Sequence, residues 1–159
     1  MNLLGIETIF WLVLAASVIH VIEEYAGGWV KFMNSFSNPI GHTTVGTFYL
    51  VNGVFIFLCT LSALVNVSFT VFSLSIAALL FINAVIHVGG FIRFRKYNPG
   101  VVTAVLLYFP LSIYSYFLYD QAGMLGFTNL FLSALLGAGW MGLAVAYGMA
   151  ASRRTGRRK

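Results

Sequence analysis

Long apolar runs separated by short polar stretches make up most of this 159-residue chain. Five of the runs are each close to the ~20 residues that a helix needs to cross a bilayer, and they cover about residues 7–25, 45–65, 68–92, 101–119 and 127–150. The stretches between them hold Gly, Asn and Pro, which are typical of loops and turns, and residues 26–44 form the longest of these loops. The pattern predicts an all-α membrane protein, a bundle of five transmembrane helices in a single domain over residues 1–152 with a basic tail at 153–159.

The composition agrees with this pattern. Hydrophobic residues make up 60% of the chain and charged residues only 8%, with a mean hydropathy of +0.91, whereas an ordinary soluble domain is about 25% charged. A single cysteine, Cys59, excludes a disulfide framework and a thiolate metal cluster. The net charge of +5 comes from basic residues that flank the apolar runs, so we expect membrane lipid as a partner and no nucleic acid. We predict a multi-pass protein of the cell (inner) membrane.

The basic residues also predict the orientation. If the tail at 153–159 is cytoplasmic, five spans place the 26–44 loop and the 93–100 turn on the same side. All nine Lys and Arg residues then lie inside, while Glu7 and Asp120 lie outside, as the positive-inside rule requires. We therefore predict an external N-terminus and a cytoplasmic C-terminus.

Three scarce ionisable residues, His20, Glu23 and Glu24, fall within five positions near the end of the first span. On a helix they share one face. His20 and His87 would each lie ~7 Å inside the cytoplasmic end of a span, with Asn83 one turn deeper than His87. Because ionisable groups in a membrane helix are costly, they usually mark a functional site. We expect His20, either Glu23 or Glu24, Asn83 and His87 to converge on one cavity between the first and third spans.

Other polar residues are expected at the same depth. Asn52 lies in the second span, Thr103 is one turn into the fourth, and Tyr97 precedes Pro99 at the start of the fourth span. We predict that Asn52, Asn83, Tyr97 and Thr103 bind substrate, and that the turn forms the rim of the site with basic residues beside it for an anionic head group: Arg93, Arg95 and Lys96. An ordinary interfacial turn is the alternative. His42, in the loop, is expected to be an interfacial residue.

Three motifs follow one another along the chain: His20-x-x-Glu23-Glu24, Asn83-x-x-x-His87 and Tyr97-x-Pro99-Gly100-x-x-Thr103. They resemble the motifs of the HXXEE-domain family, small and mostly bacterial integral membrane proteins without an established activity. The resemblance runs from the first span to the fourth and leaves out the fifth span and the tail. It implies that these residues belong to the family's site, but it supplies no reaction.

Two chemistries suit the cluster. His20, His87 and one or both of Glu23 and Glu24 could bind Zn²⁺, Fe²⁺ or Mn²⁺. Without a metal, one carboxylate would keep its proton and act as an acid, with a histidine as base. Either chemistry predicts an enzyme that acts on a lipid or an isoprenoid-like, lipid-soluble substrate. Candidates for the pocket wall come from the fourth span: Tyr108, Pro110, Tyr114 and Tyr116.

Two other classes remain as alternatives. A proton- or metal-ion-coupled transporter also needs buried His and Glu, although the outer half of the spans offers few polar groups to continue a path. A non-catalytic lipid-binding or assembly subunit would explain a stripe of small residues on the fifth span. This stripe would suit either packing within the monomer or a homo-oligomer, and it consists of Ala134, Ala138, Gly142, Ala146 and Ala150.

Overall fold

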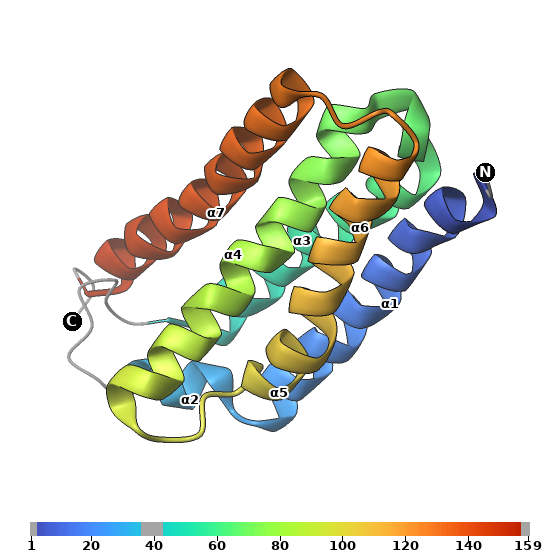
Figure 1. Cartoon of the computed structure of the whole chain (residues 1–159). Helices are drawn as coiled ribbons and strands as arrows, with labels where there is room; N and C mark the ends of the chain where they lie inside the picture. The colour runs from blue at the N-terminus through green and yellow to red at the C-terminus, as the bar shows by residue number, and fades with distance from the viewer. Residues whose placement is uncertain (1–2, 36–42, 157–159) are drawn as a thin grey trace.

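The computed structural model describes residues 3–35 and 43–156, and these residues are largely helical, with no strand among them (Figure 1). The prediction of an all-α protein is confirmed. In chain order the elements are α1 (Leu3–Ala26), α2 (Trp29–Asn34), α3 (Val45–Val65), the 3₁₀-helix η1 (Asn66–Phe69), α4 (Thr70–Phe94), α5 (Val101–Thr103), the π-helix η2 (Ala104–Tyr108), α6 (Phe109–Gln121) and α7 (Phe127–Gly156).

Four stretches of the described chain are long and apolar enough to cross a membrane: Gly5–Ala26, Val45–Phe94, Val101–Gln121 and Phe127–Arg153. The second stretch, of 50 residues, contains both α3 and α4, and the chain reverses direction between them at η1 (Figure 1). Helices of this length and hydropathy are those of a membrane protein, as the apolar runs predicted.

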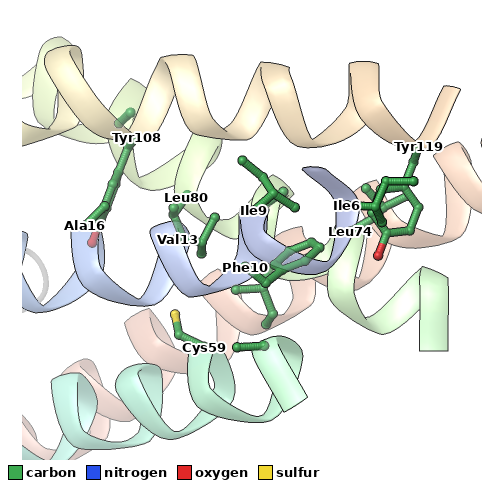
Figure 2. Close-up of a cluster of buried hydrophobic side chains, with 14 of the residues drawn as sticks. Ile6, Ile9, Phe10, Val13, Ala16, Cys59, Leu74, Leu80, Tyr108 and Tyr119 are labelled. Carbon is green, nitrogen blue, oxygen red and sulfur yellow. The ribbon is translucent and has the colours of Figure 1, made fainter. Parts of the chain in front are cut away.

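The central helix of the bundle is α4. It packs against α7, α6 and α3, and residues 73–80 are all buried. Small side chains such as Ser75, Ala77 and Ala78 let neighbouring helices approach closely there. Gly137 of α7 makes the closest approach, because a Cβ atom at this position would lie 2.6 Å from the Cβ of Ala78. On the other side, Phe10 and other apolar residues of α1 fill the core (Figure 2).

The stripe of small residues on α7 faces away from the bundle. Its five members (Ala134, Ala138, Gly142, Ala146 and Ala150) are all exposed, whereas Ser133 is buried beside Tyr116 of α6 and Gly137 is buried against α4. The stripe therefore does not serve packing within the described chain, and a homo-oligomer stays a prediction.

The helices extend beyond the expected ranges at two places. The 26–44 segment was expected to be a loop, but residues 29–34 form α2, where the rings of Trp29 and Phe32 stack with centroids 5.9 Å apart. The tail was expected to begin at residue 153, but α7 continues to Gly156, because Ala, Ser and Arg are compatible with a helix. The interpretation of His42 falls outside the described residues.

The stretch Val101–Gln121 changes its helical winding. It begins as α5, widens into the π-helix η2, and returns to α-helix at Phe109. Pro110 has no N–H to donate to the carbonyl of Leu106, which interrupts the ordinary ladder at this level. Single π-turns of this kind are frequent at functional sites.

Candidate functional site

Three buried side chains, His20 and Glu24 from α1 and His87 from α4, meet at one point between these helices. Glu24 Oε1 lies 3.7 Å from His20 Nε2 and 3.3 Å from His87 Nε2. The two imidazole rings stand edge to face with centroids 4.9 Å apart. One ligand atom from each residue lies within 4.8 Å of the others, so the three could hold one metal ion. We call them the triad.

The two ring nitrogens of His20 have different neighbours. His20 Nδ1 lies 2.7 Å from Thr103 Oγ1, and this hydroxyl donates to Glu23 Oε2 at 2.5 Å. A hydroxyl has one proton, so when Thr103 donates to Glu23 it accepts from Nδ1 of His20, and the other ring nitrogen, Nε2, points towards Glu24. This buried Nε2 atom has no hydrogen-bond partner and faces the carboxylate of Glu24. A proton or a metal ion between Nε2 and this carboxylate would satisfy both groups.

Glu23 turns away from the triad. Its carboxylate accepts hydrogen bonds from the Tyr97 hydroxyl, from the backbone N–H groups of Gly100, Val102 and Thr103, and from the Thr103 hydroxyl. These groups lie at the start of α5, where free N–H groups and the helix dipole favour an anion. Glu23 therefore does not belong to the triad, and its role as a catalytic residue and metal ligand stays a prediction.

Tyr97 completes this arrangement at the surface. Its ring is half-exposed, and its hydroxyl donates to Glu23 Oε1 at 2.8 Å. Partial burial, together with the nearby carboxylate, raises the pKa of Tyr97 to about 12. The phenol therefore stays protonated and keeps donating to Glu23 well above neutral pH.

Gly100 packs directly against both imidazoles. It has φ +95°, which favours glycine, and a Cβ atom there would lie 2.6 Å from Cε1 of His87 and 2.8 Å from Cε1 of His20. Gly90 has a similar role, since its Cβ would lie 2.6 Å from Nδ2 of Asn98, which donates to the His87 carbonyl at 2.9 Å. The turn thus holds both histidines in place. Pro99 directly precedes the Gly100 cap of α5, as expected.

Aromatic rings flank the triad on two sides. The Tyr108 ring lies 4.3 Å from the His20 ring, and the Trp29 ring lies 5.1 Å from the His87 ring, measured between centroids. In an α-helix, Thr103 and Tyr108 would be about 140° apart around the axis. Bonds from i to i+5 in the π-turn bring residues five apart onto one face, so both contact His20. Trp29 was missed by sequence reasoning, because it lies in a segment that was expected to be a loop.

A cavity of about 800 Å³ adjoins the triad and is lined by residues of α2, α3, α4 and α7 together with Glu24. Both α3 and α7 pack against α4 but hardly touch each other, and the cavity lies between them. Its walls are mostly apolar. Near the triad they carry Asn52, whose Nδ2 lies 3.4 Å from Glu24 Oε2, and Asn83, whose buried Oδ1 has no hydrogen-bond partner.

Several predicted lining residues lie elsewhere. Tyr97 and Thr103 contact Glu23 and His20 and do not line the cavity, and their role in substrate binding stays a prediction. The turn contributes Asn98 to the wall instead. None of the four candidates from the fourth span (Tyr108, Pro110, Tyr114 and Tyr116) lines the cavity. The reason is that α6 packs on α1 and α4, whereas the walls come from other helices.

A model of a protein family matches residues 11–115 and is described as "Protein of unknown function with HXXEE motif". The matched range includes the triad, Glu23 and the 97–103 turn. No curated protein and no solved structure matches the chain.

Proposed function

The chain belongs to the HXXEE family, whose function is unknown, and we propose that it is a membrane-embedded enzyme that acts on a lipid-like substrate with a divalent metal ion held by the triad. One observation carries this proposal. His20 Nε2, which has no hydrogen-bond partner, and the carboxylate of Glu24 face each other, buried and 3.7 Å apart. A cation shared with His87 would satisfy all three groups at once.

The donor set favours a metal over a lone proton. Two neutral imidazoles and one carboxylate suit Zn²⁺, Fe²⁺ or Mn²⁺, and three protein ligands leave a coordination position open for chemistry. A ligating histidine commonly donates its other ring N–H to an oxygen acceptor that fixes its tautomer. Thr103, anchored by Glu23, does this for His20. When bound, such an ion would polarise a substrate oxygen or activate water.

The cavity supports an amphiphilic substrate. Its polar part near the triad holds Glu24, His87 and the two asparagines, and most of the remaining wall is apolar. Asn83 Oδ1 is free to accept a hydrogen bond from a polar group placed beside the triad. Asn52 positions the second oxygen of Glu24. The apolar walls hold the hydrocarbon part and exclude water from the reacting groups.

The topology belongs to this proposal. The reversal at η1 lets α3 and α4 each cross the bilayer, which gives five spans with an external N-terminus and a cytoplasmic C-terminus. His20 and His87 then lie ~9–10 Å from the ends of their helices, in the cytoplasmic half of the inner membrane. The exposed stripe on α7 would serve a homo-oligomer.

Metal content tests the proposal. The protein is purified in detergent without chelators, incubated with Zn²⁺, Mn²⁺ or Fe²⁺, desalted and measured by inductively coupled plasma mass spectrometry. We expect about one ion per chain in the wild type and a loss of bound metal in Glu24→Gln and His87→Ala. Glu7→Gln is the matched control, because Glu7 is exposed near the other end of α1.

The same samples are followed by thermal unfolding. A variant that loses metal but unfolds cooperatively has lost the site and not the fold. A folded wild type that binds none of the three metals would contradict the metal proposal. In that case a proton would lie between His20 and Glu24, and an acid–base enzyme would replace the metal-dependent enzyme as the proposed function.

A further inference from the structure

One face of α4 runs along the cavity and changes its chemistry from one end to the other. Leu79 lines the deep end, Asn83 and His87 line the middle, and Arg93 lines the end nearest the 93–100 turn. The offsets of 4, 8 and 14 residues from Leu79 keep these positions on one side of the helix. The cavity therefore runs from an apolar end through the triad to a cationic mouth.

We propose that the cavity binds an anionic membrane lipid, with its phosphate or carboxylate head group at Arg93 and its chains between α3 and α7. This assignment names the substrate class of the proposed function and rests on it. Arg93 and His87 are six residues apart, so the triad lies ~9 Å deeper than Arg93 along the helix axis. A lipid held in this way places its linkage region, and not its head group, beside the triad.

Charge complementarity identifies the head group. Arg93 lines the cavity, and no carboxylate of the described chain forms an ion pair with it; its guanidinium carbon lies 6.0 Å from the centroid of the Phe94 ring. Guanidinium groups bind phosphate and carboxylate through paired hydrogen bonds. Arg95 and Lys96 do not line the cavity, although they belong to the same basic turn.

The apolar part of the cavity identifies the rest of the ligand. Side chains of α3 and α7 such as Val54 and Leu143 line it, and both are more than half exposed in the chain alone. About 800 Å³ is large enough for a hydrocarbon chain but is poorly suited to a free inorganic anion. Because α3 and α7 make few contacts with each other, a lipid hydrocarbon chain can enter the cavity between these helices from the bilayer.

Tryptophan fluorescence can report on this cavity directly. Trp29 and Trp140 line it, whereas Trp11 is exposed on α1 and is removed in a Trp11→Phe background. The protein is placed in detergent micelles with phosphatidylglycerol or phosphatidylcholine carrying the same brominated chains, which quench indole at short range. The test variant is Arg93→Gln, and Arg95→Gln is the matched control because it removes the same charge outside the cavity wall.

We expect phosphatidylglycerol to reach half-maximal quenching at about one fifth of the mole fraction that phosphatidylcholine needs. This preference should disappear in Arg93→Gln and persist in Arg95→Gln. Equal quenching by the two lipids, or a preference that survives in Arg93→Gln, would overturn the proposal. Inorganic phosphate is added as a competitor, and full displacement of the preference at millimolar phosphate would assign the site to a free anion instead.

Metal content of the same samples separates this outcome from the proposed function. Arg93→Gln should keep its metal, since Arg93 does not belong to the triad. Lipid preference without metal would leave the binding site standing and contradict the metalloenzyme. Bound metal without lipid preference would contradict only the assignment of the substrate.

Discussion

Replacing Gly100 with alanine should damage the triad without touching any of its residues. The new Cβ would lie 2.6 Å from Cε1 of His87 and 2.8 Å from Cε1 of His20. Carbon atoms in favourable contact are ~3.5 Å apart, so the two rings would have to retreat by about 0.9 Å and 0.7 Å. Metal ligands keep their distances to within ~0.2 Å, and the displacement exceeds this several times.

Two energetic terms follow from the same geometry. A non-glycine residue at φ +95° costs ~1–2 kcal/mol, and forcing a methyl group into a packed site costs ~1–3 kcal/mol more. Metal affinity should fall further than the ~100-fold that marks the loss of a strong outer-shell partner, because the ligands themselves are displaced.

Gly28→Ala separates these terms. Gly28 also has a positive φ, of +75°, but nothing lies within 4 Å of the Cβ it would gain. The Gly28→Ala variant should therefore have a free energy of unfolding ~1–2 kcal/mol lower than the wild type, from backbone strain alone, and should keep its metal. Competition with a chromogenic chelator measures affinity in both variants, and thermal unfolding measures stability. If folded Gly100→Ala binds metal as tightly as Gly28→Ala, the two histidines do not share an ion at the site described.

Three further predictions test the surroundings of the triad and the topology. Thr103→Val should weaken metal binding ~10–100-fold, because His20 loses the acceptor that fixes its tautomer. Thr103→Ser keeps the hydroxyl and should bind metal as the wild type does. An affinity that chelator competition finds unchanged in Thr103→Val would show that the hydroxyl has no such role. Tyr97→Phe should lower the unfolding temperature by a constant amount from about pH 7 to about pH 10. Because folding raises the pKa of Tyr97, the hydrogen bond from its phenol to Glu23 stabilises the protein fully below the pKa of the unfolded chain, and this stabilisation is lost as the pH rises towards about 12. If the difference in unfolding temperature between the variant and the wild type already shrinks below pH 9, the assignment is contradicted. A reporter fused to the C-terminus should behave as cytoplasmic and one near Asp120 as external; the reverse would move the site to the other half of the bilayer.

The sequence predicted the helices because membrane spans are specified locally. A run of apolar residues long enough to cross the bilayer has to be helical, since lipid offers no partner for free backbone groups. The helices therefore begin and end close to the expected residues. The exceptions are α2 and the last turns of α7, where polar or aromatic residues are compatible with either a helix or a loop.

The sequence also predicted the composition of the site in part. His20 and Glu24 are four residues apart on one helix, so their proximity needs no tertiary information. His87 was expected beside them because its depth matched, and the structure places it there. Gly100 stands in the third motif of the sequence, and the structure shows that it packs against the two imidazoles.

Only the tertiary structure could decide between the two adjacent carboxylates. Glu23 and Glu24 differ by about 100° around α1, and both directions lead towards the interior of the bundle. One side of α1 meets the N–H groups at the start of α5, and the other meets His87 on α4. The different positions of the two carboxylates, like the cavity walls from α3 and α7, depend on how separate helices pack. Side chains such as Ala78 and Gly137 fix this packing through contacts that the order of residues along the chain does not reveal.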